Sequence, residues 1–185
     1  MRSQLIASRA RLSQEERSAR SREVAARLEA LDLYRDCPTV ALYAPLGTEV
    51  DASEIARLAL RRGVRIVYPR AEPGQRLMVF ARCDPSSLIR GPLGVGEPPA
   101  DALLVPLEEI QCVVMPGVAF SEDGLRLGRG GGYYDATLMR APRARRVGVA
   151  YDLQVVPILP REPHDALLDA VVTEARTLRF ERDFR

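Results

Sequence analysis

The chain has 185 residues, of which 46% are apolar and 28% charged, and we expect residues 1–185 to form one globular domain. All 27 basic residues are arginine and the net charge is only +2, which indicates neither a nucleic-acid nor a membrane partner. The apolar runs are far too short to cross a bilayer, and the polar, arginine-containing start is unlike a cleavable signal.

The amino-terminal third predicts helices followed by a parallel pair of strands. Residues 2–31 carry apolar positions at helical spacing, and Ser13 with Glu16 forms a capping box, so we expect two helices that meet at Ser13. A β-rich run follows at Thr39–Ala44, then a helical segment at Ser53–Arg62 and a second β-rich run at Val64–Tyr68. Strand, helix and strand in this order imply a parallel pair.

The rest of the chain continues this alternation. We expect an edge strand at Arg76–Arg82, a loop at Gly91–Pro99 and a buried strand at Val113–Met115. A helix should follow at Tyr133–Met139, then a strand at Val147–Ala150 and a last strand at Val171–Thr173. The pattern is typical of an α/β layered sheet, in which ligands bind at the carboxyl ends of the strands.

The cysteines indicate a reduced environment. Cys37, Cys83 and Cys112 are widely spaced and match no zinc or Cys-x-x-Cys pattern, which favours a cytoplasmic location. Cys112 precedes an apolar run, and we expect it in the core together with Met115 and Phe120.

The most informative segment runs from Met115 to Asp135. It reads Met115-Pro-Gly-Val-Ala-Phe120, then Arg126-Leu-Gly-Arg-Gly-Gly-Gly-Tyr-Tyr-Asp135. Glycines let backbone amides approach an anion closely, two arginines add planar donors for phosphate oxygens, and a helix beginning near Tyr133 would direct its positive end at the same point. A carboxylate beside a bound anion indicates an intervening cation such as Mg²⁺. The segment therefore favours a polyphosphate site with magnesium.

Another interpretation of this segment is a tight turn, which is the commonest use of a glycine-rich run. No Lys-Ser or Lys-Thr follows, so the pattern is not a Walker motif. No strand with an acidic end follows at the spacing of a dinucleotide fingerprint. The residue pattern alone leaves phosphate binding and a structural turn about equally open.

The stretch from Met115 to Leu138 resembles the defining motif of the 5-formyltetrahydrofolate cyclo-ligase family, also called 5,10-methenyltetrahydrofolate synthetases. That motif is Pro-Gly, an apolar pair, Phe, then Arg-Leu-Gly-x-Gly-x-Gly-Tyr-Tyr-Asp. The likeness extends to the segments 12–17, 42–51 and 163–174. It implies a Rossmann-like three-layer α/β/α sandwich with a mostly parallel sheet, an architecture shared with sugar-phosphate isomerases and CoA transferases.

The resemblance implies a ligase of one-carbon metabolism that converts 5-formyltetrahydrofolate to 5,10-methenyltetrahydrofolate and releases ADP and phosphate, with ATP and Mg²⁺ as cofactors. The formyl oxygen is a poor leaving group, so it is first phosphorylated, and N10 then closes the ring as phosphate departs. No protein nucleophile is needed, and catalysis would consist of positioning and charge neutralisation. We expect a monomer or a weak homo-oligomer.

The resemblance also assigns site residues. The catalytic set is Arg129, Tyr133 and Asp135. The ATP-binding set is Arg2, Arg126, Leu127, Gly128, Arg129, Gly130, Gly131, Gly132, Tyr133 and Tyr134. The folate-binding set is Ala44, Glu49, Arg129, Gly130, Gly131, Gly132 and Tyr133. The magnesium ligands are Asp135 and Asp165.

Some of these residues also have a plainer interpretation. Asp135 would suit the first turn of a helix, with or without a metal. Glu49 is either a solvated loop acid or, as in the family, an acceptor for N–H groups of the pterin ring. Tyr43, Ala44 and Pro45 either wall the pterin pocket or belong to the core. The only histidine, His164, is as easily a loop residue as a general base.

The amino terminus departs from the family pattern, which usually carries a Lys that contacts ATP phosphate, followed by Leu-Arg. Aligned on Leu12-Ser13, the chain begins too late to include this Lys, and Arg2 falls where the motif has its Arg. Either the true start lies upstream, or another arginine substitutes, or ATP affinity is weaker.

Other functions stay open on the sequence alone. Sugar-phosphate isomerases and CoA transferases need a catalytic carboxylate or lysine, and the chain has no lysine. A folate- or nucleotide-binding regulator without turnover would fit the missing amino-terminal Lys. A nucleic-acid-binding module is disfavoured, because the arginines are spread through helices and balanced by acids.

Overall fold

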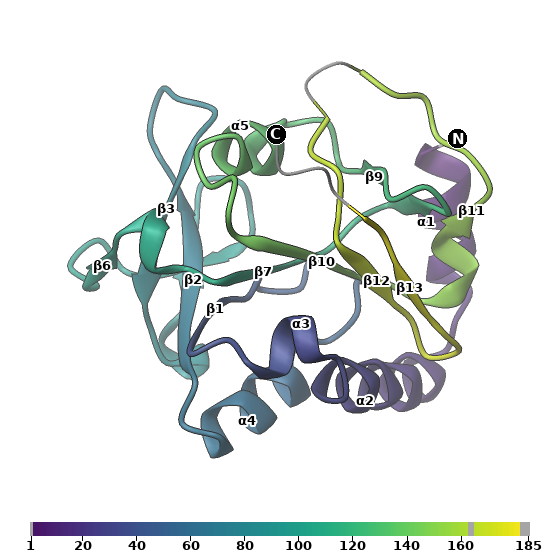
Figure 1. Ribbon diagram of the computed structural model, residues 1–185, viewed down its shortest axis with the longest axis horizontal. Coiled ribbons are helices and arrows are strands. Elements are labelled where there is room, and N and C mark those ends of the chain that lie inside the picture. Colours follow the sequence, from purple (N-terminus) through teal and green to yellow (C-terminus); the bar gives the residue numbers. More distant parts are fainter. Residues whose placement is uncertain (1, 163–164, 182–185) are drawn as a thin grey trace.

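The computed structural model of the protein, which describes residues 2–162 and 165–181, is a layered α/β structure (Figure 1). Its α-helices are α1 (Arg2–Ala10), α2 (Gln14–Glu29), α3 (Asp32–Arg35), α4 (Ser53–Arg61) and α5 (Tyr133–Leu138). Its strands are β1 (Thr39–Ala41), β2 (Arg65–Ala71), β3 (Met78–Arg82), β4 (Ile89–Arg90), β5 (Gly96–Glu97), β6 (Leu104–Val105), β7 (Cys112–Met115), β8 (Ala119–Ser121), β9 (Arg126–Leu127), β10 (Arg145–Val149), β11 (Val155–Val156), β12 (Ala170–Val172) and β13 (Thr177–Arg179).

The two amino-terminal helices meet at the predicted capping box. The Glu16 amide donates to Ser13 Oγ at 3.1 Å, and the Ser13 amide donates to Glu16 Oε2 at 2.7 Å. These reciprocal bonds satisfy amides that lack a partner at the start of α2. The predicted pair of helices is confirmed.

The main sheet of the described residues has eight strands in the order β13-β12-β10-β7-β1-β2-β3-β6. The five strands from β12 to β2 are parallel, with Val40 of β1 opposite Ile66 of β2. The flanking strands β13, β3 and β6 are antiparallel to their neighbours. The predicted mostly parallel sheet is therefore confirmed.

Three sequence-based assignments of strand position are wrong. The predicted edge strand, observed as β3, is covered by β6, because Leu104–Val105 pairs outside it. The expected loop at Gly91–Pro99 contains β5, which pairs with β4. The expected last strand, observed as β12, is followed by β13. Strands of two or three residues carry too short an alternation to be recognised in the sequence.

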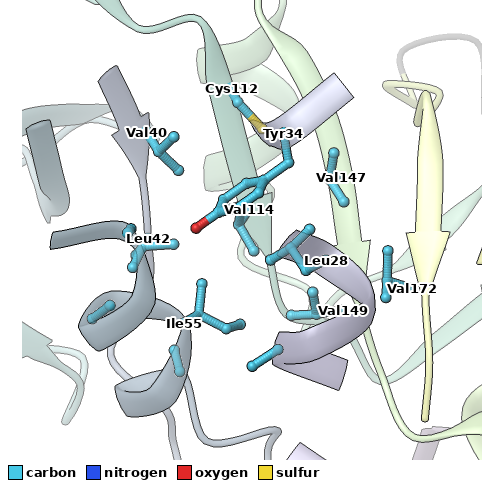
Figure 2. Close-up of a cluster of buried hydrophobic side chains, with 14 of the residues drawn as sticks. Leu28, Tyr34, Val40, Leu42, Ile55, Cys112, Val114, Val147, Val149 and Val172 are labelled. Atoms are coloured by element: carbon cyan, nitrogen blue, oxygen red, sulfur yellow. The ribbon is translucent and has the colours of Figure 1, made fainter. Parts of the chain in front are cut away.

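The strands of the sheet bury side chains on both faces, and this produces three layers. In β7, Cys112 and Val114 belong to the cluster beneath α2 and α4, which Figure 2 shows. Val113 and Met115 belong to the cluster on the opposite face, together with Phe120. In Figure 1, α2, α3 and α4 cover one face and α5 lies over the other. The three-layer expectation and the core positions of Cys112, Met115 and Phe120 are confirmed.

No helix among the described residues has the length and apolar character needed to cross a membrane. The three cysteines are free thiols.

Candidate functional site

The glycine-rich motif lies at the carboxyl ends of the parallel strands. β7, in the middle of the sheet, leads into Pro116 and Gly117, and β8 and β9 then form an antiparallel pair. The glycine run 128–132 connects β9 to α5. This is the edge at which sheets of this class bind ligands.

A cavity of about 920 Å³ opens at this edge. All residues that the sequence assigned to the catalytic, ATP, folate and magnesium sets line it: Arg2, Ala44, Glu49, Arg126, Leu127, Gly128, Arg129, Gly130, Gly131, Gly132, Tyr133, Tyr134, Asp135 and Asp165. Tyr43 lines the cavity and is also part of the core, whereas Pro45 is exposed outside it. His164 lies outside the described residues.

The glycine run adopts backbone conformations that other residues rarely reach. Gly130 has φ of +101° and Gly132 has φ of +70°, and a Cβ at either position would find nothing within 4 Å. The loop therefore exposes bare backbone to open space. α5 begins at Tyr133 as predicted, but with six residues its dipole is small, so anion binding here would depend on the glycine backbone and the arginines.

Arg126 and Asp135 form an ion pair in the wall of the cavity. Arg126 Nη2 lies 3.2 Å from Asp135 Oδ2, and the side chains are 6% and 20% exposed. The Arg126 guanidinium lies 5.0 Å from the centre of the Tyr134 ring, and Nη1 donates to the Pro116 carbonyl at 3.5 Å. Among the described residues, Asp135 Oδ1 has no partner, so this oxygen is free for a cation.

A second pair joins the glycine loop to the segment after β1. Arg129 Nε donates to Glu49 Oε1 at 3.1 Å, across 80 positions in sequence. Glu49 Oε2 accepts a bond from the Leu46 amide at 3.0 Å. Glu49 is 9% exposed, so of its two interpretations the solvated loop acid is wrong.

Two tyrosines in the cavity wall stay protonated at ordinary pH. Burial raises the pKa of Tyr43 and of Tyr134, because the charged phenolate would lose its hydration. The Tyr43 hydroxyl donates to the Val50 carbonyl at 2.7 Å. The Tyr43 and Tyr134 side chains therefore form an uncharged part of the cavity wall and are not suited to act as acids or bases.

Arg2 and Arg9 connect α1 to the motif. Arg2 Nε donates to the Gly128 carbonyl at 3.1 Å. Arg9, which is 2% exposed, donates from Nε to Thr48 Oγ1 at 3.0 Å and from Nη1 to the Gly117 carbonyl at 3.2 Å. Burial lowers the pKa of Arg9, an effect that the nearby Glu49 carboxylate opposes.

Sequence reasoning missed Arg9, Arg76 and Glu97. Arg9 hydrogen-bonds both Thr48, beside Glu49, and Gly117, at the start of the motif loop. Arg76 and Glu97 line the cavity. The seven-residue spacing of Arg2 and Arg9 places them two turns apart on one helical face and could have drawn attention to Arg9. Nothing in the sequence around Arg76 or Glu97 distinguishes them from surface charges.

A smaller cavity of about 420 Å³ lies elsewhere and contains none of the predicted site residues. Arg145 in its wall donates to the Leu33 carbonyl at 3.1 Å and to Cys37 Sγ at 3.6 Å. These bonds hold α3 and the following Cys37 against β10, so the contacts of Arg145 are structural.

The protein is thus a three-layer α/β sandwich in which the glycine loop and arginine side chains line one cavity at the carboxyl ends of the parallel strands. The 5-formyltetrahydrofolate cyclo-ligase family matches residues 1–174, and the chain belongs to this family. The predicted family and the predicted enzyme class, a ligase, are therefore confirmed.

Three known proteins illustrate the relationship. The 5-formyltetrahydrofolate cyclo-ligase of Escherichia coli (strain K12) is 36% identical over 143 residues, which cover 75% of this chain and 79% of that protein. The NMR structure of Aquifex aeolicus 5,10-methenyltetrahydrofolate synthetase is 34% identical, with a TM-score of 0.84 over 98% of this chain and 91% of that one. The synthetase structure from Mycoplasma pneumoniae is 27% identical, with a TM-score of 0.76 over 94% and 96%.

Proposed function

We propose that this protein converts 5-formyltetrahydrofolate to 5,10-methenyltetrahydrofolate with consumption of ATP in the presence of Mg²⁺ and release of ADP and phosphate. The observation that carries the proposal is that one cavity contains every residue that the family motif assigns to ATP, folate and metal. Membership of the family and the names of the relatives support it.

The ATP side of the site would consist of the glycine loop, Arg126 and Arg2. The backbone at Gly130 and Gly132 borders open space, because a Cβ at either position would meet no atom within 4 Å, and a phosphate group could therefore approach the loop amides without a steric barrier. The Arg126 guanidinium is held from several directions and can present planar donors without reorganising. When bound, ATP supplies the phosphoryl group that makes the formyl oxygen a good leaving group.

Asp135 and Asp165 would hold Mg²⁺ on the phosphate side. The described residues contain no cluster of three or more metal-ligating side chains, so the protein alone does not form a full metal cage. One or two carboxylates acting together with phosphate oxygens are the usual ligands of Mg²⁺, and Asp135 Oδ1 is free for this purpose. Asp165 Oδ2 accepts a bond from the Glu162 amide at 2.6 Å, which orients its carboxylate.

The folate side would be formed by Ala44, Glu49 and the loop from Arg129 to Tyr133. The bond from Arg129 holds Glu49 at the boundary between the two sides. Catalysis would then consist of bringing the formyl group beside the phosphates and of neutralising charge with Arg126 and Arg129. We also propose that the chain acts as a single domain in the cytoplasm, as a monomer or weak homo-oligomer.

The test is to incubate the purified protein with 5-formyltetrahydrofolate, Mg²⁺ and ATP and to follow the near-ultraviolet absorbance of methenyltetrahydrofolate, with ATP omitted as the control. Product that requires ATP supports the proposal. Tight folate binding without product or ATP consumption would indicate a regulator instead. A folded protein that binds neither ligand would contradict both functions.

A further inference from the structure

Glu97 in β5 carries a buried carboxylate that the proposed roles do not use. The residue is 7% exposed and lines the large cavity next to Ala71. Its Oε1 accepts one long hydrogen bond, 3.5 Å, from the Ala71 amide. Within residues 2–162 and 165–181, the carboxylate has no other hydrogen bond and no arginine within 4 Å.

The second oxygen of this carboxylate, Oε2, keeps some exposure. It makes no hydrogen bond to the described residues, yet it is not among their fully buried side-chain atoms that lack a partner. A buried carboxylate with a single long hydrogen bond is unfavourable, because that bond does not replace the hydration that the charge has lost. Glu97 therefore has the acceptor capacity that a ligand with N–H groups requires.

The surrounding fold makes room for this carboxylate. A Cβ at Gly91 would lie only 2.3 Å from Glu97 Cδ and 2.5 Å from Oε2, so only glycine permits this side-chain position. The Gly91 amide donates to the Val95 carbonyl at 2.8 Å, which closes the turn between β4 and β5. The hairpin thus holds the carboxylate at the cavity wall while supplying it with almost no hydrogen bonds.

Glu97 lies close to the residues proposed for the folate. A Cβ at the neighbouring Gly96 would be 3.0 Å from the Ala44 side chain, so β5 packs directly on the Ala44 wall. Both oxygens of Glu49 already have protein partners, Arg129 and the Leu46 amide. Of these two buried carboxylates, Glu97 has the larger unused acceptor capacity.

We propose that Glu97 is a folate-binding residue whose carboxylate accepts a hydrogen bond from an N–H group of 5-formyltetrahydrofolate. This inference rests on the proposed function. The ligand offers N–H donors on its pterin ring and at N10, whereas the phosphates of ATP offer only acceptors and negative charge. Glu97 consequently favours the folate and repels a phosphate placed in the same part of the cavity.

The test uses the full chain with Glu97→Leu and Glu97→Gln, and with Glu23→Gln as a matched control on the exposed face of α2. Calorimetric titration should show folate binding weakened roughly tenfold to a hundredfold by Glu97→Leu, as expected for loss of a bond to a charged acceptor, and less by Glu97→Gln. The affinity for ATP should not fall in either variant. The ligand-free protein should melt at a higher temperature in Glu97→Leu, because an unpaired buried charge has been removed.

The outcomes are distinguishable from failure of the proposed function. Unchanged folate affinity in both Glu97 variants, with a wild type that binds and converts folate, overturns the inference and leaves the function standing. A lower melting temperature in both variants also overturns it, because the carboxylate would then be satisfied by the protein. A wild type that neither binds nor converts folate refutes the proposed function and this inference with it. Gly91→Ala, which displaces the carboxylate without removing its charge, should likewise weaken folate binding.

Discussion

Replacing Asp135 by asparagine separates its proposed metal role from its structural one. The substitution keeps the shape of the side chain and removes its charge. In the wild type, Asp135 Oδ2 pairs with Arg126 while Oδ1 remains free. We therefore expect two measurable effects, a moderate loss of stability and a larger loss of magnesium affinity.

The stability effect follows from the burial of the pair. Removing one partner of a buried ion pair costs about 3–5 kcal/mol when the other charge is left without compensation. Asparagine still offers Oδ1 as an acceptor, and Arg126 keeps the Pro116 carbonyl and the Tyr134 ring, so we expect about 1–2 kcal/mol instead. For a chain of this length that corresponds to a fall in melting temperature of about 2–8 °C.

The activity effect is read from the magnesium dependence. The measurement is the Mg²⁺ concentration that gives half of the maximal rate when ATP and folate are saturating. Loss of a residue that only hydrogen-bonds a metal ligand typically weakens metal affinity roughly 10–100-fold, so loss of a direct ligand in Asp135→Asn should raise this concentration by at least as much. Arg126→Gln breaks the same ion pair but keeps the carboxylate, so it should raise the KM for ATP and leave the magnesium dependence near that of the wild type. Asp101→Asn, at an exposed position, serves as the control for loss of charge.

One result would refute this reasoning. If Asp135→Asn melts 2–8 °C lower but keeps the magnesium dependence of the wild type, then Asp135 only positions Arg126 and is not a metal ligand.

Three further predictions concern the two sides of the site and the core. Glu49→Gln should raise the KM for folate about tenfold and that for ATP much less, and equal effects on both would argue against a pterin contact. Gly132→Ala and Gly63→Ala, with φ of +70° and +75° and open space at each Cβ, should both destabilise by about 1–2 kcal/mol in thermal unfolding. Only Gly132→Ala should also weaken ATP binding, and unchanged ATP affinity there would remove the loop from the phosphate site. The neighbouring Cys112 thiol lowers the pKa of Cys37 from 9.0 to about 7, so the folded state favours the thiolate and the unfolding free energy should rise from pH 7 to 9. Urea titrations should show that this rise disappears in Cys37→Ser, and a rise of equal size in that variant would contradict the assignment.

Local signals account for most of the secondary structure and for the composition of the site. The capping box at Ser13 identified the start of α2, because its hydrogen bonds join residues only three positions apart. Apolar runs located the central strands, since residues buried on both faces of a sheet must be apolar throughout. The spacing of glycine, arginine and aspartate between Arg126 and Asp135 indicated the loop, and every residue it suggested lines one cavity.

Long-range packing set the features that no local pattern encodes. The order of strands at the sheet edges depends on which short segments find a partner, so β6 covers β3 and β13 extends the sheet beyond β12. The partners of the charged groups depend on contacts between distant segments, as in the bond from Arg129 to Glu49. Burial of Arg9 and of Glu97 arises in the same way, because exposure is a property of the assembled layers and not of the residues beside each one in the chain.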